Sequence, residues 1–188
     1  MSESRLHNPL DALAATSRRS PAVALDLVQA RARFSFRARN AAAVDAAGAA
    51  FGVALPRQAC RFEEADGKRA LWLGPDEWLL VMPMADGTRH LEALEKALAG
   101  KPSSLVDVSH RSLAFTVTGP QAAAILNSGC PLDLSSEAFP VGMCTRTVLA
   151  KTEIILLRTA EDRFLVDVWR SFAPYAWSWL EEARREFV

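Results

Sequence analysis

Runs of alternating and of helix-periodic hydrophobic residues occur in the same order twice along this chain. In the first half they occupy residues 33–36, 40–51, 69–73, 77–82 and 88–99. In the second half they occupy residues 113–117, 121–128, 145–150, 153–158, 164–169 and 172–187. A period of two predicts strands, and a period near 3.6 predicts helices. The order strand, helix, strand pair, helix therefore predicts an α+β fold of two similar halves, offset by about 80 residues.

Turn and linker residues divide the chain further. Asp66-Gly67 favours the positive φ angles of a tight hairpin turn, and we match this turn with residues 160–162 in the second half. Glycine and proline near residue 100 end the first half. We predict an N-terminal arm over residues 1–20, extended or partly mobile and outside the core, a first half over 21–100 and a second half over 101–188. The halves form two domains or one compact domain, and an apolar run at residues 24–28 suggests an extra strand.

The composition is that of a globular chain without a strong overall charge. Half of the 188 residues are hydrophobic, and 22 basic residues balance 22 acidic ones. A neutral chain has no general attraction for nucleic acid or for an acidic membrane surface. The sequence shows neither an apolar run long enough to cross a bilayer nor the apolar centre of a signal peptide. We therefore expect a cytoplasmic protein with no nucleic-acid or membrane partner.

Arginines are frequent in the first forty residues. Alternation over residues 33–37 places Phe34 and Phe36 on one face of a strand and Arg33 and Arg37 on the other. The arginine face is either solvated or a basic interface for an acidic partner. Nucleic-acid binding would instead place aromatic rings among the charges, on the same face.

Motifs for cofactor binding and covalent catalysis are missing from the sequence. We find no dinucleotide-binding GxGxxG turn, phosphate-binding loop, GxSxG elbow or HExxH pair. The three cysteines, Cys60, Cys130 and Cys144, lack CxxC spacing, so we expect reduced and mostly buried thiols. We therefore identify no catalytic, cofactor-binding or metal site that this chain could build alone.

The densest polar cluster lies at residues 107–111. Asp107, Ser109 and His110 have the composition of a catalytic triad, but strand alternation would place His110 on the opposite face from the other two. A structural turn or a buried polar network is the better interpretation. Arg111 is a candidate charged contact for a partner protein.

Aromatic residues near the C-terminus are candidates for partner contacts. Trp177 and Trp179 lie two apart on a predicted helix and point in different directions, so we expect one of them to face a partner. Trp169 and Arg170 join the last strand to the last helix. The planar guanidinium of Arg170 would suit a carboxylate on this chain or on another subunit.

An ordered set of short motifs resembles the gamma subunit family of bacterial heterotetrameric sarcosine oxidase. The motifs are LGPDEWLL (73–80), DVSHR (107–111), GCPLDL (129–134), FPVG (139–142), RT (146–147) and WRSFAPY (169–175). Each is weak alone, but their order is specific, and the resemblance extends over residues 20–185.

The resemblance implies a small subunit of an αβγδ complex. That complex oxidises sarcosine to glycine, passes the one-carbon unit to tetrahydrofolate and forms hydrogen peroxide. FAD, FMN, NAD and zinc are implied on the partner subunits and none in this chain, which would have the folate-binding fold of aminomethyltransferases. The implied partners are the alpha, beta and delta subunits, mainly alpha. No catalytic residue transfers, and we predict Arg111, Arg146, Trp169 and Arg170 as contacts with the alpha subunit.

Two other functions stay open. A stand-alone folate-binding or aminomethyltransferase-like protein would need a carboxylate to hold the pterin, and Asp107, Asp167 or Glu153 could serve. Strand alternation places Asp167 on the face opposite Val166 and Val168. A homo-oligomeric binding module is the third reading. Within the complex, the substrate could also be a related N-methyl amine.

Overall fold

The computed structural model describes residues 8–187. The first sheet and its helices consist of β2 (Arg31–Arg37), α2 (Ala41–Phe51), β3 (Phe62–Ala65), β4 (Lys68–Gly74), β5 (Glu77–Pro83), α3 (Gly87–Leu98) and β6 (Ser104–Asp107). The others are α1 (Asp11–Thr16), β1 (Ala24–Leu27), β7 (Ser112–Thr118), α4 (Ala122–Asn127), β8 (Cys144–Leu149), β9 (Thr152–Ala160), β10 (Arg163–Trp169) and α5 (Ala173–Ala183). Short 3-10 helices cover Met84–Asp86 and Arg185–Phe187.

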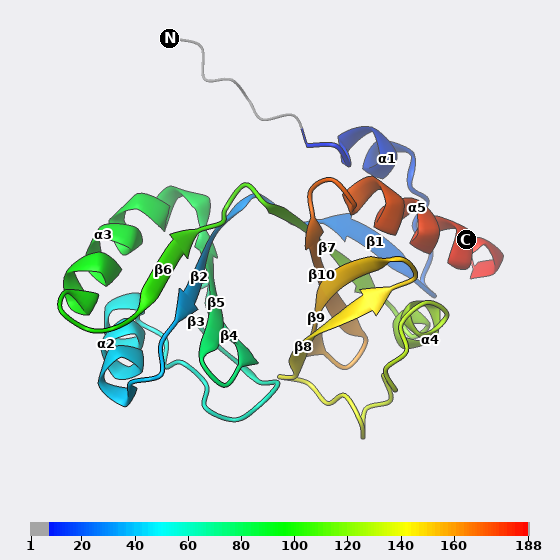
Figure 1. The fold of residues 1–188 in the computed structure, drawn as a ribbon. Helices are drawn as coiled ribbons and strands as arrows, with labels where there is room; N and C mark the ends of the chain where they lie inside the picture. The colour runs from blue at the N-terminus through cyan, green and yellow to red at the C-terminus, as the bar shows by residue number, and fades with distance from the viewer. Residues whose placement is uncertain (1–7, 188) are drawn as a thin grey trace, which may run out of the picture.

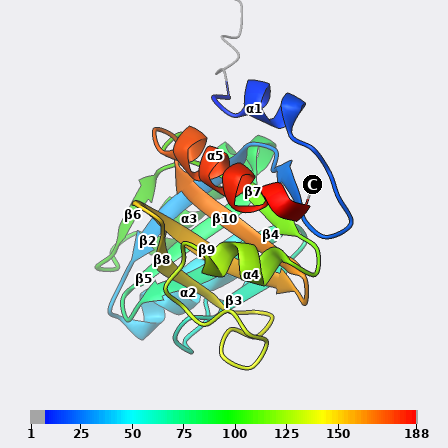
Figure 2. The same cartoon turned by 90° about the vertical axis from the view of Figure 1, so that its right-hand side faces the viewer.

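Two antiparallel five-stranded sheets face each other, and helices cover their outer faces (Figures 1 and 2). We name them the N-sheet, with strand order β3-β4-β5-β2-β6, and the C-sheet, with order β1-β7-β10-β9-β8. Helices α2 and α3 cover the N-sheet, whereas α4 and α5 cover the C-sheet. This arrangement confirms the predicted α+β fold of two similar halves. Within residues 8–187, no helix combines the length and the apolar composition needed to cross a membrane.

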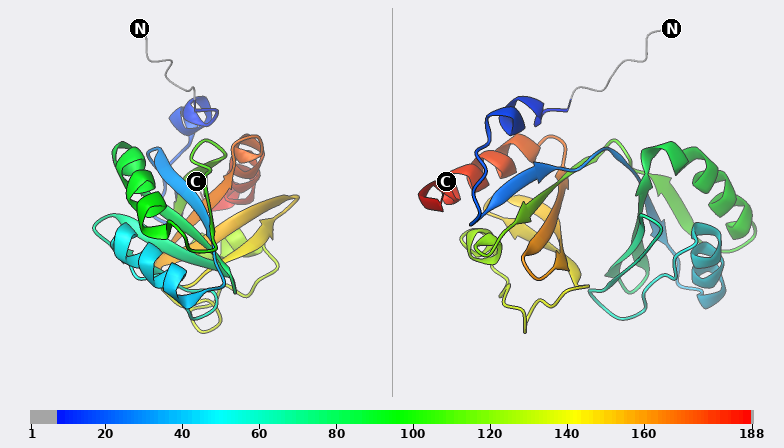
Figure 3. Two further views of the ribbon diagram at one scale, coloured as in Figure 1. Left: turned by 60° about the vertical axis from the view of Figure 1, so that its left-hand side comes forward. Right: turned by 180° about the vertical axis from the view of Figure 1, so that it is seen from behind.

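Each sheet takes an edge strand from beyond the predicted limits of its half. Strand β1 comes from the start of the chain but pairs with β7 in the C-sheet. Strand β6 follows residue 100 but pairs with β2 in the N-sheet. The chain therefore crosses between the sheets before β2 and again before β7 (Figure 3). The division of the chain at residue 100 stays a prediction, and the sheets do not follow it.

The hairpin turns show which parts of the two halves correspond. Asp66 and Gly67 have φ angles of 50° and 72°, as the predicted tight turn between β3 and β4 requires. By strand order, its counterpart is the β8–β9 turn, where Ala150 has φ 52°. The predicted match with residues 160–162 was wrong, because those residues turn between β9 and β10.

Local signals explain the two helices of the N-sheet. The Asn40 side chain accepts a hydrogen bond from the Ala42 amide at 2.8 Å and caps α2, which ends at Gly52 with φ 81°. Helix α3 buries His90, Leu94 and Leu98 at intervals of one turn. Its amphipathic pattern was predicted from the same spacing.

Part of the predicted N-terminal arm is folded onto the C-terminal helix. Leu10 is fully buried in the core beneath the C-sheet. Ser17 Oγ donates to Glu181 at 2.5 Å and accepts from the buried Arg184 at 2.8 Å. The expectation of an extended arm outside the core is wrong for this segment, because α1 packs against α5. Residues 1–7 of the predicted arm lie outside the described residues. The extra strand is confirmed as β1.

The space between the sheets has an apolar part and a polar part. The apolar part is a small buried cluster of Leu71, Leu79, Ala114, Cys144, Ile155, Leu157 and Leu165. Polar side chains, among them Arg33 and Asp167, continue the same inner faces. The candidate site lies in this polar part.

Candidate functional site

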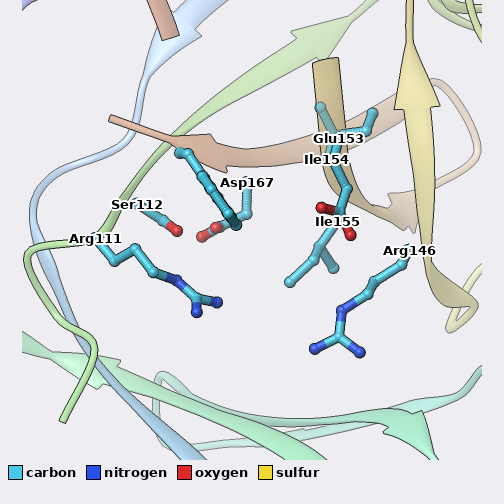
Figure 4. Close-up of a pocket in the computed structure, with 8 residues that line it drawn as sticks. Arg111, Ser112, Arg146, Glu153, Ile154, Ile155 and Asp167 are labelled. Atoms are coloured by element: carbon cyan, nitrogen blue, oxygen red, sulfur yellow. The ribbon is translucent and has the colours of Figure 1, made fainter. Parts of the chain in front are cut away.

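A cavity of about 140 Å³ opens at the polar end of the space between the sheets (Figure 4). Its lining residues are Arg111, Ser112, Arg146, Glu153, Ile154, Ile155, Asp167 and Trp169. Three of the four residues predicted from the sequence as partner contacts therefore meet here, together with two of the three candidate carboxylates. Arg170 and Asp107 do not line the cavity.

Strand register brings the polar residues onto one face of the C-sheet. Arg146 on β8 lies opposite Ile155 on β9, which in turn lies opposite Asp167 on β10. Ser112 on β7 lies opposite Trp169. Because side chains directly opposite each other share a face, these residues all point towards the N-sheet. Val166 and Val168, which flank Asp167 on β10, pack under the helices, as the predicted alternation requires.

Arg33 and Asp167 form a buried ion pair between the two sheets. Arg33 Nε donates to Asp167 Oδ2 at 2.7 Å, and the two side chains are only 4% and 6% exposed. Arg33 therefore lies on neither a solvated face nor a partner interface, and both predicted readings were wrong for this residue. The second sheet covers this strand face, whereas Arg37 at the strand end stays exposed and pairs with Asp76 at 3.0 Å.

Opposing effects act on the carboxyl group of Asp167. Burial is the largest effect and raises the pKa of Asp167 above its usual value. The positive charge and hydrogen bond of Arg33, the Ser112 hydroxyl and the charge of Arg111 all act in the opposite direction. The carboxyl group is thus already committed to groups of this chain, which makes it a poor candidate for holding a pterin.

Arg146 and Glu77 form a second ion pair between the sheets. Arg146 Nη1 donates to Glu77 Oε2 at 3.1 Å, and Nη2 contacts the other carboxylate oxygen. The hydrogen bond from Arg146 lowers the pKa of Glu77, against a smaller opposing effect of burial. This two-point contact joins β8 to β5 beside the cavity.

Exposed aromatic rings gather where β10 passes into α5. Trp169, Phe172 and Tyr175 are 44%, 45% and 38% exposed. The guanidinium carbon of Arg111 lies 5.5 Å from the centre of the Trp169 ring, a cation–π contact. The amide of Arg170 donates to the carbonyl of Arg111 at 2.8 Å, which links the two segments. We call Arg111, Trp169, Arg170, Phe172 and Tyr175 the corner patch.

Sequence reasoning found only part of the corner patch. Phe172 and Tyr175 were not singled out, although their spacing of three in the first turn of a helix places them on one face. The two tryptophans expected to diverge do so, with Trp177 fully buried. Trp179 is half-buried and packs so closely on Gly129 that a Cβ atom there would lie 2.5 Å from its ring.

The cluster at residues 107–111 is structural. Asp107 Oδ1 accepts hydrogen bonds from the Ser109 amide at 2.8 Å and from its hydroxyl at 2.5 Å. Ser109 Oγ in turn accepts from the Arg33 amide at 3.0 Å. His110 is exposed on the turn. The interpretation as a structural turn is confirmed, whereas its polar network is only partly buried, because Ser109 is buried and Asp107 is exposed.

The described residues offer no group of three or more His, Cys, Asp or Glu placed to hold a metal ion. All three cysteines are free thiols, with Cys60 half-buried and Cys130 and Cys144 buried. Burial is the main reason that the pKa of Cys144 rises to about 12. Cys144 is therefore a protonated thiol near neutral pH and a weak nucleophile.

Comparison with known proteins gives consistent matches in sequence and in structure. The model of the "Sarcosine oxidase, gamma subunit family" matches residues 36–186. Sarcosine oxidase subunit gamma of Arthrobacter sp. is 35% identical over 144 residues, which cover 76% of this chain and 70% of that protein. The corresponding subunit of Corynebacterium sp. (strain P-1) is 34% identical over 140 residues, covering 74% and 68%.

Solved structures share the fold. A chain of heterotetrameric sarcosine oxidase from Corynebacterium sp. U-96, in complex with pyrrole 2-carboxylate, superposes with a TM-score of 0.89 at 31% identity, covering 96% of this chain and 95% of that one. Aminomethyltransferase T of the Bartonella henselae glycine cleavage system gives 0.63 at 16% identity, covering 92% and 49%. The second match shows likeness of fold, as predicted. The family match and the gamma-subunit relatives place this chain in the sarcosine oxidase gamma subunit family.

Proposed function

We propose that this chain is a non-catalytic subunit of a complex that oxidatively demethylates sarcosine to glycine, or a related N-methyl amine to the corresponding amine. In this proposal the one-carbon unit passes to tetrahydrofolate, and oxygen becomes hydrogen peroxide. FAD, FMN, NAD and zinc are bound by the alpha, beta and delta subunits. Membership of the gamma subunit family supports the assignment to such a complex.

The corner patch is the structural observation that supports a partner-binding role. Exposed tryptophan, phenylalanine and tyrosine side chains beside arginines are typical of the centres of protein interfaces. A shallow depression continues the patch between Pro9 and Pro174. We propose that the alpha subunit covers this surface, with Trp169 and Arg170 as direct aromatic and polar contacts. Arg111, which lines both this depression and the cavity, lies at the border of the interface. Arg146, on another side of the cavity, also stays in the proposal as a contact with the alpha subunit.

Co-purification tests this function. The tagged chain would be isolated from the cytoplasmic fraction of its native cells, and the eluate examined by mass spectrometry and by flavin absorbance. We expect two large flavoprotein subunits, a small zinc-binding subunit and sarcosine-dependent peroxide formation. A colourless monomer or homodimer would contradict the proposal.

A paired variant tests the role of the corner patch. Trp169→Ala with Phe172→Ala should reduce recovery of the flavoprotein subunits by at least about tenfold, because truncating aromatic anchors at an interface typically costs more than 1 kcal/mol each. Val141→Ala is the matched control, since Val141 is 53% exposed and lies outside the patch. Equal recovery with both variants would place the interface elsewhere.

A stand-alone folate-binding protein is the second candidate. The likeness to the aminomethyltransferase fold supports it, as does Glu153, whose carboxylate makes no hydrogen bond or ion pair with any described residue. Titration of the isolated chain with tetrahydrofolate distinguishes the two functions. Saturable binding by a chain that captures no flavoprotein would favour this candidate.

A further inference from the structure

The charged residues lining the cavity differ in how their charges are balanced. Arg146 is paired with Glu77, and Asp167 is paired with Arg33. The side chains of Arg111 and Glu153 form no ion pair and no hydrogen bond with the residues that the structure describes. Both residues are exposed, so one positive and one negative group of the cavity have hydrogen-bonding atoms that face solvent and are open to a ligand.

The Arg111 guanidinium is held in place without using its donors. Its contact with the Trp169 ring, 5.5 Å from the ring centre, engages the cation through the ring face, and its side-chain N–H groups make no hydrogen bond with any residue in the described range 8–187. Ordering the side chain in advance reduces the entropy lost when a ligand binds. A guanidinium presented in this way suits the two oxygens of a carboxylate.

Glu153 supplies the opposite charge on another side of the same cavity. It belongs to β9, where Glu153 and Ile155 share the inner face of the C-sheet. Figure 4 shows Arg111 and Glu153 on different sides of the cavity, with Ile155 between them. Ile155 and Trp169 supply apolar surface beside these charges.

We propose that this cavity binds a small amino-acid zwitterion, with its carboxylate on Arg111 and its ammonium group on Glu153. A simple anion would face the carboxylates of Glu153 and Asp167, and a simple cation would face Arg111 and Arg146. A zwitterion satisfies both unpaired groups at once. The volume of about 140 Å³ holds only a few non-hydrogen atoms, since one liquid water occupies about 30 Å³.

Glycine and sarcosine are the natural probes, and this choice rests on the proposed function. The site would then respond to the substrate or product of the complex without taking part in the oxidation. N-methylation of the ligand is tolerated in this arrangement, because Ile155 and Trp169 offer apolar contacts for the methyl group.

The test is a titration of the full chain, monitored by NMR of the arginine Nε–H signals. The Arg111 signal is assigned as the one that disappears in Arg111→Met. Glycine and sarcosine should shift this signal saturably. Binding to the variants is measured by the rise in melting temperature that the ligand causes. Arg111→Met should weaken glycine binding at least about tenfold, the loss typical of a charge-assisted contact. Glu153→Gln should weaken glycine binding but strengthen the weaker binding of acetate, because one of the carboxylates that face the anion is removed. Arg163→Met and Glu161→Gln, exposed at the other end of the β9–β10 hairpin, are matched controls.

Several outcomes would overturn the inference: no saturable shift with glycine or sarcosine, equal binding of acetate and glycine, or no effect of Glu153→Gln. Co-purification with the oxidase subunits is read separately. A chain that assembles but does not bind glycine contradicts only the zwitterion site. A chain that binds glycine but captures no flavoprotein contradicts only the proposed function.

Discussion

The buried ion pair of Arg33 and Asp167 is the residue-level feature with the largest expected effect on stability. Arg33→Met leaves the Asp167 carboxyl group buried without its partner, which should lower the free energy of unfolding by about 3–5 kcal/mol. Urea denaturation at neutral pH measures this loss. The double variant Arg33→Met, Asp167→Leu should recover much of it, because neither charge remains.

The pH dependence of the Arg33→Met variant has a definite sign. Burial raises the pKa of Asp167 in the folded state, and loss of the Arg33 charge removes the main opposing effect. The neutral acid is then favoured in the fold, so the deficit relative to the wild type should shrink as pH falls towards about 4, the usual value for an unfolded aspartate. A deficit that grows on acidification would contradict the assignment.

Thiol reactivity should separate the three cysteines. Half-buried Cys60 should react first with iodoacetamide in the native protein, whereas Cys144 is buried and protonated because its pKa lies at about 12. Peptide mass spectrometry over time, at pH 8, measures the order. Denaturation in urea should make all three react alike, and early labelling of Cys144 in the native state would contradict the structure.

At the scale of elements, the Arg146–Glu77 contact joins one strand of each sheet. Because Arg146 lowers the pKa of Glu77, the contact stabilises the fold above the unfolded glutamate pKa of about 4.3, and this contribution is lost as pH falls through the lower folded value. Arg146→Met should cost about 0.2–1 kcal/mol at pH 7 and progressively less at acidic pH, since the pair is partly exposed. Urea denaturation from pH 3 to 7 follows the difference.

Arg57→Met is the control for that series. Arg57 pairs with Asp45, but both side chains are more than half exposed and the pair does not join the sheets. We expect no measurable change with pH for this variant. An equal effect in both variants would show that the contact between the sheets has no special role.

The periodic elements were predictable, whereas two of the short edge strands were not. Helix α3 and strands β2, β5 and β10 carry clear hydrophobic patterns, and the predicted segments overlap them. Strands β3 and β6 have four residues each and are largely exposed, so their sequences lack an alternating buried face. They are strands because β4 and β2 pair with them, which is a non-local effect.

At the scale of the whole molecule, the exchange of edge strands makes a prediction about fragments. Fragment 101–188 lacks β1, and fragment 21–100 lacks β6, so each should expose an unpaired sheet edge. We expect that neither fragment gives a dispersed NMR spectrum by itself. We also expect fragment 29–107, which keeps β6, to be better folded than fragment 29–100. Independent folding of fragments 21–100 and 101–188 would instead support the domain limits predicted from the sequence.

The sequence by itself determined the class of fold, its internal repetition and the family, because hydrophobic periodicity and short motifs are local properties of the chain. The tertiary structure decided which polar residues meet. Alternation placed Arg33 on one strand face, but only the opposing sheet, with Asp167 on it, made that face an interior. The cavity at Arg111 and Glu153 likewise joins residues from separate strands, and charge pairing between sheets depends on distances that no local pattern encodes.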